Sequence, residues 1–393
     1  MTLTVLRHFN DFLVFYEVGK VFIQDIENLY NPSNYLWPFR YFPLGGLPFT
    51  PFSQLSFEAA FITFNIFSVF INFLICLLIY KISGLISQNK EKDVSENKIM
   101  YISLYLLALP HVYNYAMGQV NSLLTFLLLI SLYIFLKYDK TVFNLIGGIL
   151  IGISVNIKPI TIFIVPFLIT FSIYSKVHKF NKEEITESLI RVLGVLVPIF
   201  LNIIFFLLIP ELLTGFLEIN FIGTETLKIN NSFSITKLII NAMTMLNVEM
   251  SLLKQLQIIL FLIILLIMGG TGFLIFLLRK REKNAILYGF ILGIVITLLV
   301  YFDTWDLHLI LLFPLMIISI LNLEETANGI EEKFFLQKVM KKSLYFFLFI
   351  DLPIFGIIYF VRDVFPYNFV PTIFLILLFV SVGRFLLKEG KEN

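Results

Sequence analysis

Long apolar runs separated by short polar segments dominate the chain from residue 57 to its end. A helix of about 20 residues spans a hydrocarbon core of about 30 Å, and helices satisfy the backbone polar groups there. We therefore expect an all-α, polytopic helical membrane protein with about eleven transmembrane helices. Two of the runs, 99–112 and 309–321, are short enough to be half-helices or to continue into the loops. The expected spans are 57–80, 99–112, 119–136, 142–157, 159–174, 192–209, 256–278, 284–300, 309–321, 343–360 and 371–387.

The composition excludes a water-soluble protein. Hydrophobic residues make up 58% of the chain and charged residues 14%, whereas a soluble domain has about 45–50% apolar and about 25% charged residues. The formal net charge of +2 provides no basic field for nucleic acid, so the expected partner is the lipid bilayer and what dissolves in it. The single cysteine, Cys76, lies in the first apolar run, which rules out an internal disulfide and a Cys-based metal site.

Most Lys and Arg residues fall in alternate loops, and cytoplasmic loops hold the excess of these residues. This rule assigns the loops 81–98, 175–191 and 322–342 and the C-terminus to the cytoplasm. The segments 1–56 and 210–255 then lie on the opposite face. We expect a multi-pass protein of the plasma membrane or an equivalent membrane, with an extracytoplasmic segment 1–56 ahead of a helical membrane domain 57–393.

The first outer segment combines acids with aromatic residues and prolines. Residues 11–26 have an amphipathic pattern at helical spacing, which predicts a helix that lies along the membrane surface. This helix contains Asp11 and Glu17, and an aromatic-proline run with Arg40 and Tyr41 follows. A carboxylate held beside aromatic rings can act as a general base, because partial burial tunes its basicity. The alternative is that Asp11 only caps the helix.

A polar turn at 110–121 joins two of the apolar runs on the same outer face. Its side chains include Gln119 and Asn121, which can donate hydrogen bonds to a sugar or a phosphate. The alternative is that they cap a helix or bond between helices, without any ligand.

Two basic side chains lie at outer helix ends, where few basic residues are expected. The ammonium of Lys158 suits a phosphate, and the alternative is that it extends to the membrane interface. His308 follows Asp306 in the polar turn 303–308, and it can donate to an anionic oxygen or orient a base. The alternative for His308 is a buried histidine whose hydrogen bonds are satisfied. The sequence contains no Gly-rich phosphate loop, zinc-ligand spacing or nucleophile elbow, which argues against a soluble nucleotide-dependent enzyme.

Together and in this order, these segments resemble glycosyltransferase family 87, the polyprenyl-phosphate-mannose-dependent mannosyltransferases of the GT-C superfamily. The resemblance spans roughly residues 10–315, and the ordered set of motifs is more specific than any one of them. The motifs are Asp11-Phe-Leu-Val-Phe-Tyr, Leu29-Tyr30, Tyr41-Phe-Pro, Gly118-Gln119-Val-Asn121, Gly148-Ile-Leu-Ile-Gly152, Lys158-Pro159 and Trp305-Asp-Leu-His308.

The resemblance implies a GT-C-like fold and an inverting transferase. Such an enzyme moves a hexose, here expected to be mannose, from a polyprenyl (dolichyl) phosphate carrier to a hydroxyl of a cell-envelope glycan or glycolipid. By position, Asp11 is the expected base, and His308 and Lys158 stabilise the departing phosphate. No cofactor is expected, and the lipid-phosphate sugar is a co-substrate. No metal is expected, because the sequence shows no compact carboxylate pair; Asp303 and Asp306, three residues apart, are a weak exception. The remaining expected substrate contacts are Gln119, Asn121, Tyr41, Arg40, Glu17 and Asp306.

The chain departs from the superfamily pattern at its start. These enzymes normally begin with a transmembrane helix that leads into the catalytic loop, whereas only ten residues precede Asp11 here. The pattern therefore favours a chain from which the first helix is missing. Two other classes of function stay open at this point, namely a multi-pass lipid or glycan transporter (a flippase) and a structural or assembly subunit.

Overall fold

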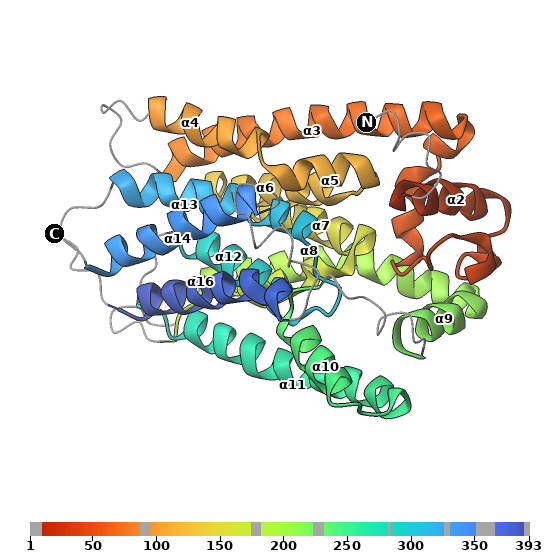
Figure 1. Cartoon of the computed structure of the whole chain (residues 1–393). Coiled ribbons are helices and arrows are strands. Elements are labelled where there is room, and N and C mark those ends of the chain that lie inside the picture. Colours follow the sequence, from red (N-terminus) through yellow and green to blue (C-terminus); the bar gives the residue numbers. More distant parts are fainter. Residues whose placement is uncertain are drawn as a thin grey trace.

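The computed structural model describes residues 10–86, 95–173, 182–222, 232–280, 284–325, 331–350 and 366–388. All regular structure in these ranges is helical, and the long helices run roughly side by side (Figure 1). The chain is therefore an all-α, polytopic membrane protein, and the number of eleven spans stays a prediction. Four helices are long and apolar enough to cross a membrane: α3 (Phe57–Ile86), α8 (Lys182–Leu208), α11 (Met250–Leu277) and α16 (Val370–Leu387). Shorter apolar helices include α6 (Asn121–Lys137), α7 (Thr141–Ile157), α10 (Ile235–Met245), α12 (Ala285–Val300) and α13 (Phe313–Glu325).

Several expected spans have other boundaries, and prolines explain two of the differences. The run 99–112 is divided into α4 (Ser95–Leu106) and α5 (Leu109–Met117), with Pro110 in the first turn of α5. The run 159–174 was expected to be an α-helix, but its residues 159–168 form the 3-10 helix η5 (Pro159–Leu168), which contains Pro166, and residues 169–173 are not helical. Proline lacks the N–H that an α-helix needs. The run 309–321 begins within the 3-10 helix η8 (Asp306–Leu311) and continues as α13.

The last two expected spans also differ. The helix α14 (Glu331–Phe349) begins well before the expected residue 343, and residues 351–360 of that span lie outside the described ranges. The final span corresponds to α16, which follows the short 3-10 helix η10 (Tyr367–Phe369).

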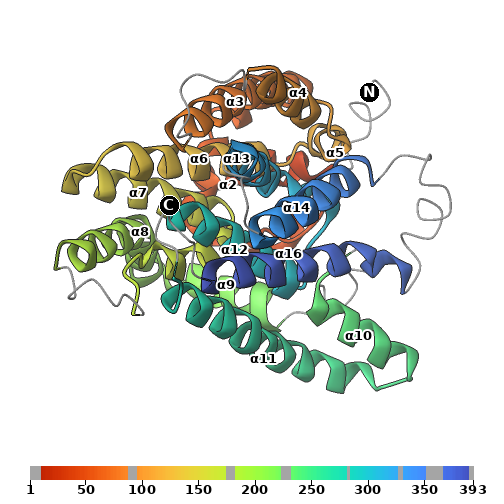
Figure 2. The same ribbon diagram turned by 90° about the vertical axis from the view of Figure 1, so that its left-hand side faces the viewer.

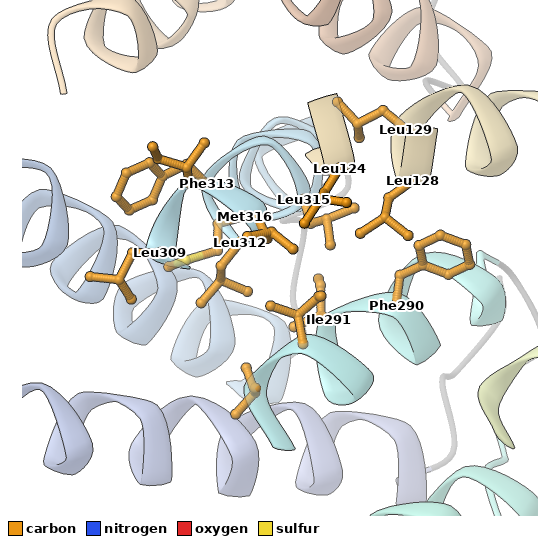
Figure 3. Close-up of a cluster of buried hydrophobic side chains, with 14 of the residues drawn as sticks. Leu124, Leu128, Leu129, Phe290, Ile291, Leu309, Leu312, Phe313, Leu315 and Met316 are labelled. Carbon is orange, nitrogen blue, oxygen red and sulfur yellow. The ribbon is translucent and has the colours of Figure 1, made fainter. Parts of the chain in front are cut away.

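The core of the bundle is built around α12, which lies near the middle (Figure 2) and packs against η5, α11 and α16. Every residue of α12 is buried, as expected for a helix that is apolar on all sides. Figure 3 shows Phe290 and Ile291 of α12 packed with leucines of α6 and with the start of α13. In contrast, few residues of α11 are buried, so its apolar side chains suit contact with lipid.

The first described element is α2 (Asp11–Gln24), whose apolar residues face the protein. Phe12 is completely buried, and its ring lies 4.9 Å from that of Phe64 and 5.5 Å from that of Phe61 of α3, between ring centroids. The amphipathic pattern thus corresponds to packing against the protein, and the position of this helix along the membrane surface stays a prediction. The chain then continues through short 3-10 helices: η1 (Ile26–Asn28), η2 (Pro32–Asn34), η3 (Pro43–Phe49) and η4 (Phe52–Gln54).

Parts of the two predicted outer segments, 1–56 and 210–255, lie at the same end of the bundle. Figure 1 shows α2 and α9 (Pro210–Leu217) at one end of the bundle, and the C-terminus at the other end. The backbone N–H of Leu44 donates to the side-chain oxygen of Asn202 in α8 at 2.9 Å, which fastens η3 to the helix that leads into α9. The π-helix η6 (Glu218–Ile222) follows α9. Which face of the membrane this end occupies stays a prediction.

Candidate active site

Asp11 is the first residue of α2, but it does not cap the helix. The cap is Asn10, which is completely buried and whose side-chain oxygen accepts from the N–H of Leu13 at 3.1 Å. The alternative that Asp11 is the capping residue is therefore wrong. Its carboxylate instead accepts a hydrogen bond from the side-chain amide of Gln119.

The close approach of Asp11 and Gln119 depends on Gly118. This glycine ends α5 with a left-handed φ of 62°, a conformation that costs other residues energy. A Cβ atom added at Gly118 would lie 2.5 Å from the Cβ of Phe12, so the turn passes directly over the start of α2. The glycine thereby places Gln119 against the neighbouring carboxylate.

Lys158 lies at the end of α7 and completes a chain of hydrogen bonds. Its ammonium donates to the side-chain oxygen of Gln119 at 3.3 Å and to that of Asn121 at 3.2 Å. Its side chain is buried, so the alternative that it extends to the membrane interface is wrong. Gln119 bridges the carboxylate of Asp11 and the ammonium, because its amide has a donor end and an acceptor end. We call these four residues, Asp11, Gln119, Asn121 and Lys158, the Asp11 cluster.

His308 lies in η8, and its two ring nitrogens have different surroundings. The Nδ1 atom accepts from the backbone N–H of Trp305 at 2.9 Å, so in the neutral ring the hydrogen is on Nε2. The Nε2 atom is buried and has no hydrogen-bond partner among the described residues. Burial, assisted by the charge of Lys158, lowers the pKa of His308 well below its ordinary value. His308 is therefore a neutral donor rather than the second cation that the sequence suggested.

Burial also shifts the acid–base properties of the Asp11 cluster. It raises the pKa of Asp11, while the hydrogen bond from Gln119 and the charge of Lys158 oppose this shift. It lowers the pKa of Lys158 to about 8, against the opposing effect of Asp303 and Asp11. A carboxylate of raised pKa is a stronger base, and an ammonium of this pKa is still mostly protonated at neutral pH.

The predicted substrate contacts divide into two groups. Arg40 lies 3.7 Å from the carboxylate of Asp303, measured from NH1 to Oδ2. Tyr41 follows directly and is electrostatically coupled to Asp11 and Asp303, so both predicted residues adjoin the cluster. Glu17 instead forms an ion pair with Lys20 at 3.0 Å.

The polar turn 303–308 contributes a residue, Asp303, that the sequence pattern did not single out. Asp306 begins η8, but the carboxylate that acts on Lys158 and on Arg40 is that of Asp303. The spacing of the turn gave no reason to prefer one acid over the other. Across the described residues, no three His, Cys, Asp or Glu side chains are grouped so as to hold a metal ion.

The fold and this site define a polytopic membrane protein with a partly buried carboxylate and a buried ammonium and imidazole gathered beside α2. The family model of glycosyltransferase family 87 matches residues 39–301, more than half of the chain. The chain therefore belongs to glycosyltransferase family 87, and it is a glycosyltransferase. A comparison with curated proteins found no match. The matched range contains Gln119 and Lys158 but neither Asp11 nor His308, so the structure adds these two side chains to the site.

Proposed function

We propose that this glycosyltransferase moves a hexose from a polyprenyl (dolichyl) phosphate to a hydroxyl of a glycan or glycolipid. The hexose proposed is mannose, and its anomeric configuration is inverted. The observation that supports the proposal best is the hydrogen-bonded chain from the partly buried Asp11 through Gln119 to the buried Lys158. It holds a general base and a cation for the leaving group within one small site. Family membership favours such transfer over the alternative of lipid or glycan transport.

In the proposed reaction, Asp11 takes the proton of the acceptor hydroxyl. The acceptor oxygen then forms a bond to the anomeric carbon, while the bond from this carbon to the phosphate oxygen breaks and leaves its electron pair on the phosphate. Gln119 orients the carboxylate, and burial makes it a better base. A single displacement inverts the anomeric configuration and needs no covalent enzyme intermediate.

The departing phosphate needs donors that are already in place, because preorganised donors stabilise developing charge most. Lys158 supplies an ammonium, and His308 supplies the N–H of its Nε2 atom, which is buried and otherwise unpartnered in the described structure. We propose that both groups contact the phosphate, with Asn121 holding the lysine from the other side. In this proposal the lipid-phosphate sugar is a co-substrate, and neither a metal nor another cofactor takes part.

The proposal is tested with the full chain reconstituted in lipid nanodiscs. Labelled polyprenyl-phosphate mannose and its glucose analogue are offered with a glycolipid acceptor, in buffer with and without EDTA, and products are analysed by mass spectrometry and NMR. We expect a new glycosidic bond of inverted configuration, mannose preferred, and no effect of EDTA. Movement of the lipid across liposomes without a new bond would instead identify a transporter.

The predicted topology has its own test. We propose that the active site faces the extracytoplasmic side of the plasma or an equivalent membrane, and that the C-terminus is cytoplasmic. Single cysteines at the exposed positions Trp37 and Lys388 can be labelled in intact cells with an impermeant maleimide. Cysteine at position 37 is expected to react, and cysteine at position 388 only after permeabilisation. The reverse pattern would invert the topology.

A further inference from the structure

One lysine that the proposed mechanism does not use is completely buried. Lys237 lies in the first turn of α10, and its side chain has an exposed fraction of 0%. A buried ammonium is costly unless negative charge compensates it. Such a residue therefore indicates either a structural ion pair or a site for an anionic ligand.

The start of α10 is fastened to the turn between α12 and η8. The hydroxyl of Thr236 donates to the carbonyl of Val300 at 2.6 Å, and the N–H of Phe233 donates to the carbonyl of Thr304 at 3.1 Å. These two bonds lie on either side of Asp303 in the sequence. The first turn of α10, which carries Lys237, is thus held beside the turn that carries both Asp303 and His308.

Asp303 connects this lysine with the rest of the site. It pairs with Arg40, and its charge acts on both Lys158 and Lys237. Burial lowers the pKa of Lys237 to about 8, against the opposing effect of Asp303. Three cations from distant parts of the sequence therefore interact electrostatically with one carboxylate, and the two lysines, whose pKa is about 8, are mostly charged at neutral pH.

The balance of charge suits a phosphate that changes its charge during the reaction. With Asp11 and Asp303 ionised, the cations Arg40, Lys158 and Lys237 outnumber the carboxylates by one, which matches the single charge of a phosphodiester-linked sugar. When Asp11 accepts the proton of the acceptor hydroxyl, the excess of positive charge becomes two. The lipid phosphate that leaves then carries up to two negative charges, so protein and lipid charges compensate each other before and after transfer.

We propose that Lys237 is a phosphate-binding residue of this site, and that Asp303 is a positioning residue that holds Arg40, Lys158 and Lys237 around the place of the lipid phosphate. The proposal rests on the proposed function, because it assigns these residues to the same donor. It places part of the donor site on α10, so the arm formed by α10 and α11 contributes to catalysis as well as to the bundle.

The test of Lys237 compares two lipids that differ only in charge. Competition experiments in nanodiscs measure the affinities for polyprenyl phosphate and for the neutral polyprenol of the same length. The wild type is expected to prefer the phosphate. Lys237→Met is expected to weaken phosphate binding about tenfold or more and to leave polyprenol binding unchanged. Lys254→Met removes a cation from α11 of the same arm, at a partly buried position, and is expected to retain the wild-type preference.

The test of Asp303 separates binding from turnover. Asp303→Asn keeps the shape of the side chain and removes its charge. Polyprenyl phosphate is expected to bind at least as tightly as to the wild type, because the cations are no longer neutralised, while kcat falls about tenfold or more because they are no longer held in place. A wild-type kcat of Asp303→Asn would overturn the positioning role.

The outcomes separate this inference from the proposed function. If the wild type prefers the phosphate and Lys237→Met keeps that preference, the assignment of Lys237 is wrong and the proposed donor stands. If the wild type itself binds polyprenyl phosphate and polyprenol equally, both the proposed donor and this inference are overturned. Circular dichroism and thermal unfolding of each variant show whether it folds, and Lys237→Arg should restore phosphate binding if charge is what matters.

Discussion

Two polar clusters in this protein contain similar side chains and differ in whether the cation contacts a carboxylate directly. In the second cluster, Arg191 of α8 donates to the side chains of Asn144 at 2.7 Å, Thr170 at 2.8 Å and Glu187 at 2.9 Å. Each donor group of the guanidinium thus has an acceptor. We call these four residues the Arg191 cluster.

In the Asp11 cluster, the cation does not bond to the carboxylate. Lys158 is held by two amide oxygens, and Gln119 separates its ammonium from the carboxylate of Asp11. In the Arg191 cluster, the guanidinium bonds directly to the carboxylate of Glu187, and the buried Nδ2 atom of Asn144 has no partner among the described residues. An ammonium that is not directly paired with a carboxylate is better placed to receive an anion, so the pairing of the charges tells more than their burial.

The largest expected effect is that of removing the base. Asp11→Asn keeps the size and one hydrogen-bonding oxygen of the side chain but cannot accept the proton. We expect the rate of transfer to fall by about 10³-fold or more, with the thermal unfolding temperature close to that of the wild type. Turnover assays with the labelled donor measure this. Transfer by Asp11→Asn at the wild-type rate would remove Asp11 as the base and end the contrast between the clusters.

The next effect concerns the buried Nε2 atom of His308, which has no partner among the described residues. His308→Phe keeps a planar ring and removes the N–H, so we expect kcat to fall by about 10²-fold. The matched control is His111→Phe in α5, since His111 is also buried and neither of its ring nitrogens has a partner among the described residues. His111 instead lies against the rings of Tyr105 and Tyr115, at centroid distances of 4.7 Å and 6.2 Å, and its replacement should change kcat less than about threefold. Equal losses in both variants would show that any buried histidine matters here.

The pH dependence gives an intermediate effect. The rate should rise with pH as Asp11 loses its proton. This acidic limb of the pH–rate profile should lie at higher pH than for an ordinary carboxyl group, because burial raises the pKa of Asp11. The rate should fall as pH increases through about 8, where Lys158 and Lys237 lose their charge. Lys158→Arg stays charged there, so its alkaline limb should be less steep than that of the wild type. An unchanged limb in this variant would mean that Lys158 does not titrate in catalysis.

The smallest expected effect on turnover is in the Arg191 cluster. Arg191→Met leaves Glu187 and Asn144 without their partner, and we expect a loss of about 2 kcal/mol in stability, since Glu187 is partly exposed. The rate per folded molecule should stay within about twofold of the wild type. Thermal unfolding and turnover of the same preparation test both parts. A large loss of turnover at unchanged stability would show that the second cluster also takes part in the chemistry.

Much of the fold follows from the apolar runs, and its exceptions have local causes. The helical class and the positions of α3, α6, α7 and α12 agree with the expected spans. The 3-10 conformation of η5 was not predicted, because a run of apolar residues is compatible with a buried α-helix and with a buried 3-10 helix. The prolines at 159 and 166 were the available signal.

The candidate site was only partly predictable. Asp11, Gln119 and Lys158 stand out in the sequence as polar residues at the ends of apolar runs, and the structure brings them together. Lys237 could not be found in this way, because it lies in a segment that looked like an ordinary loop. Its position depends on bonds from Thr236 and Phe233 to a turn more than sixty residues away in the chain.

The helix at the centre of the bundle has a consequence for biogenesis. α12 has 16 residues, which is about 24 Å of helix and less than a full hydrocarbon core. It is enclosed by other helices, so it reaches its final place only when they have assembled around it. Asp303 and His308 follow directly from its end, and the donor site therefore becomes complete late in assembly. Variants that loosen the packing of α12 should lose transfer before they lose abundance in the membrane.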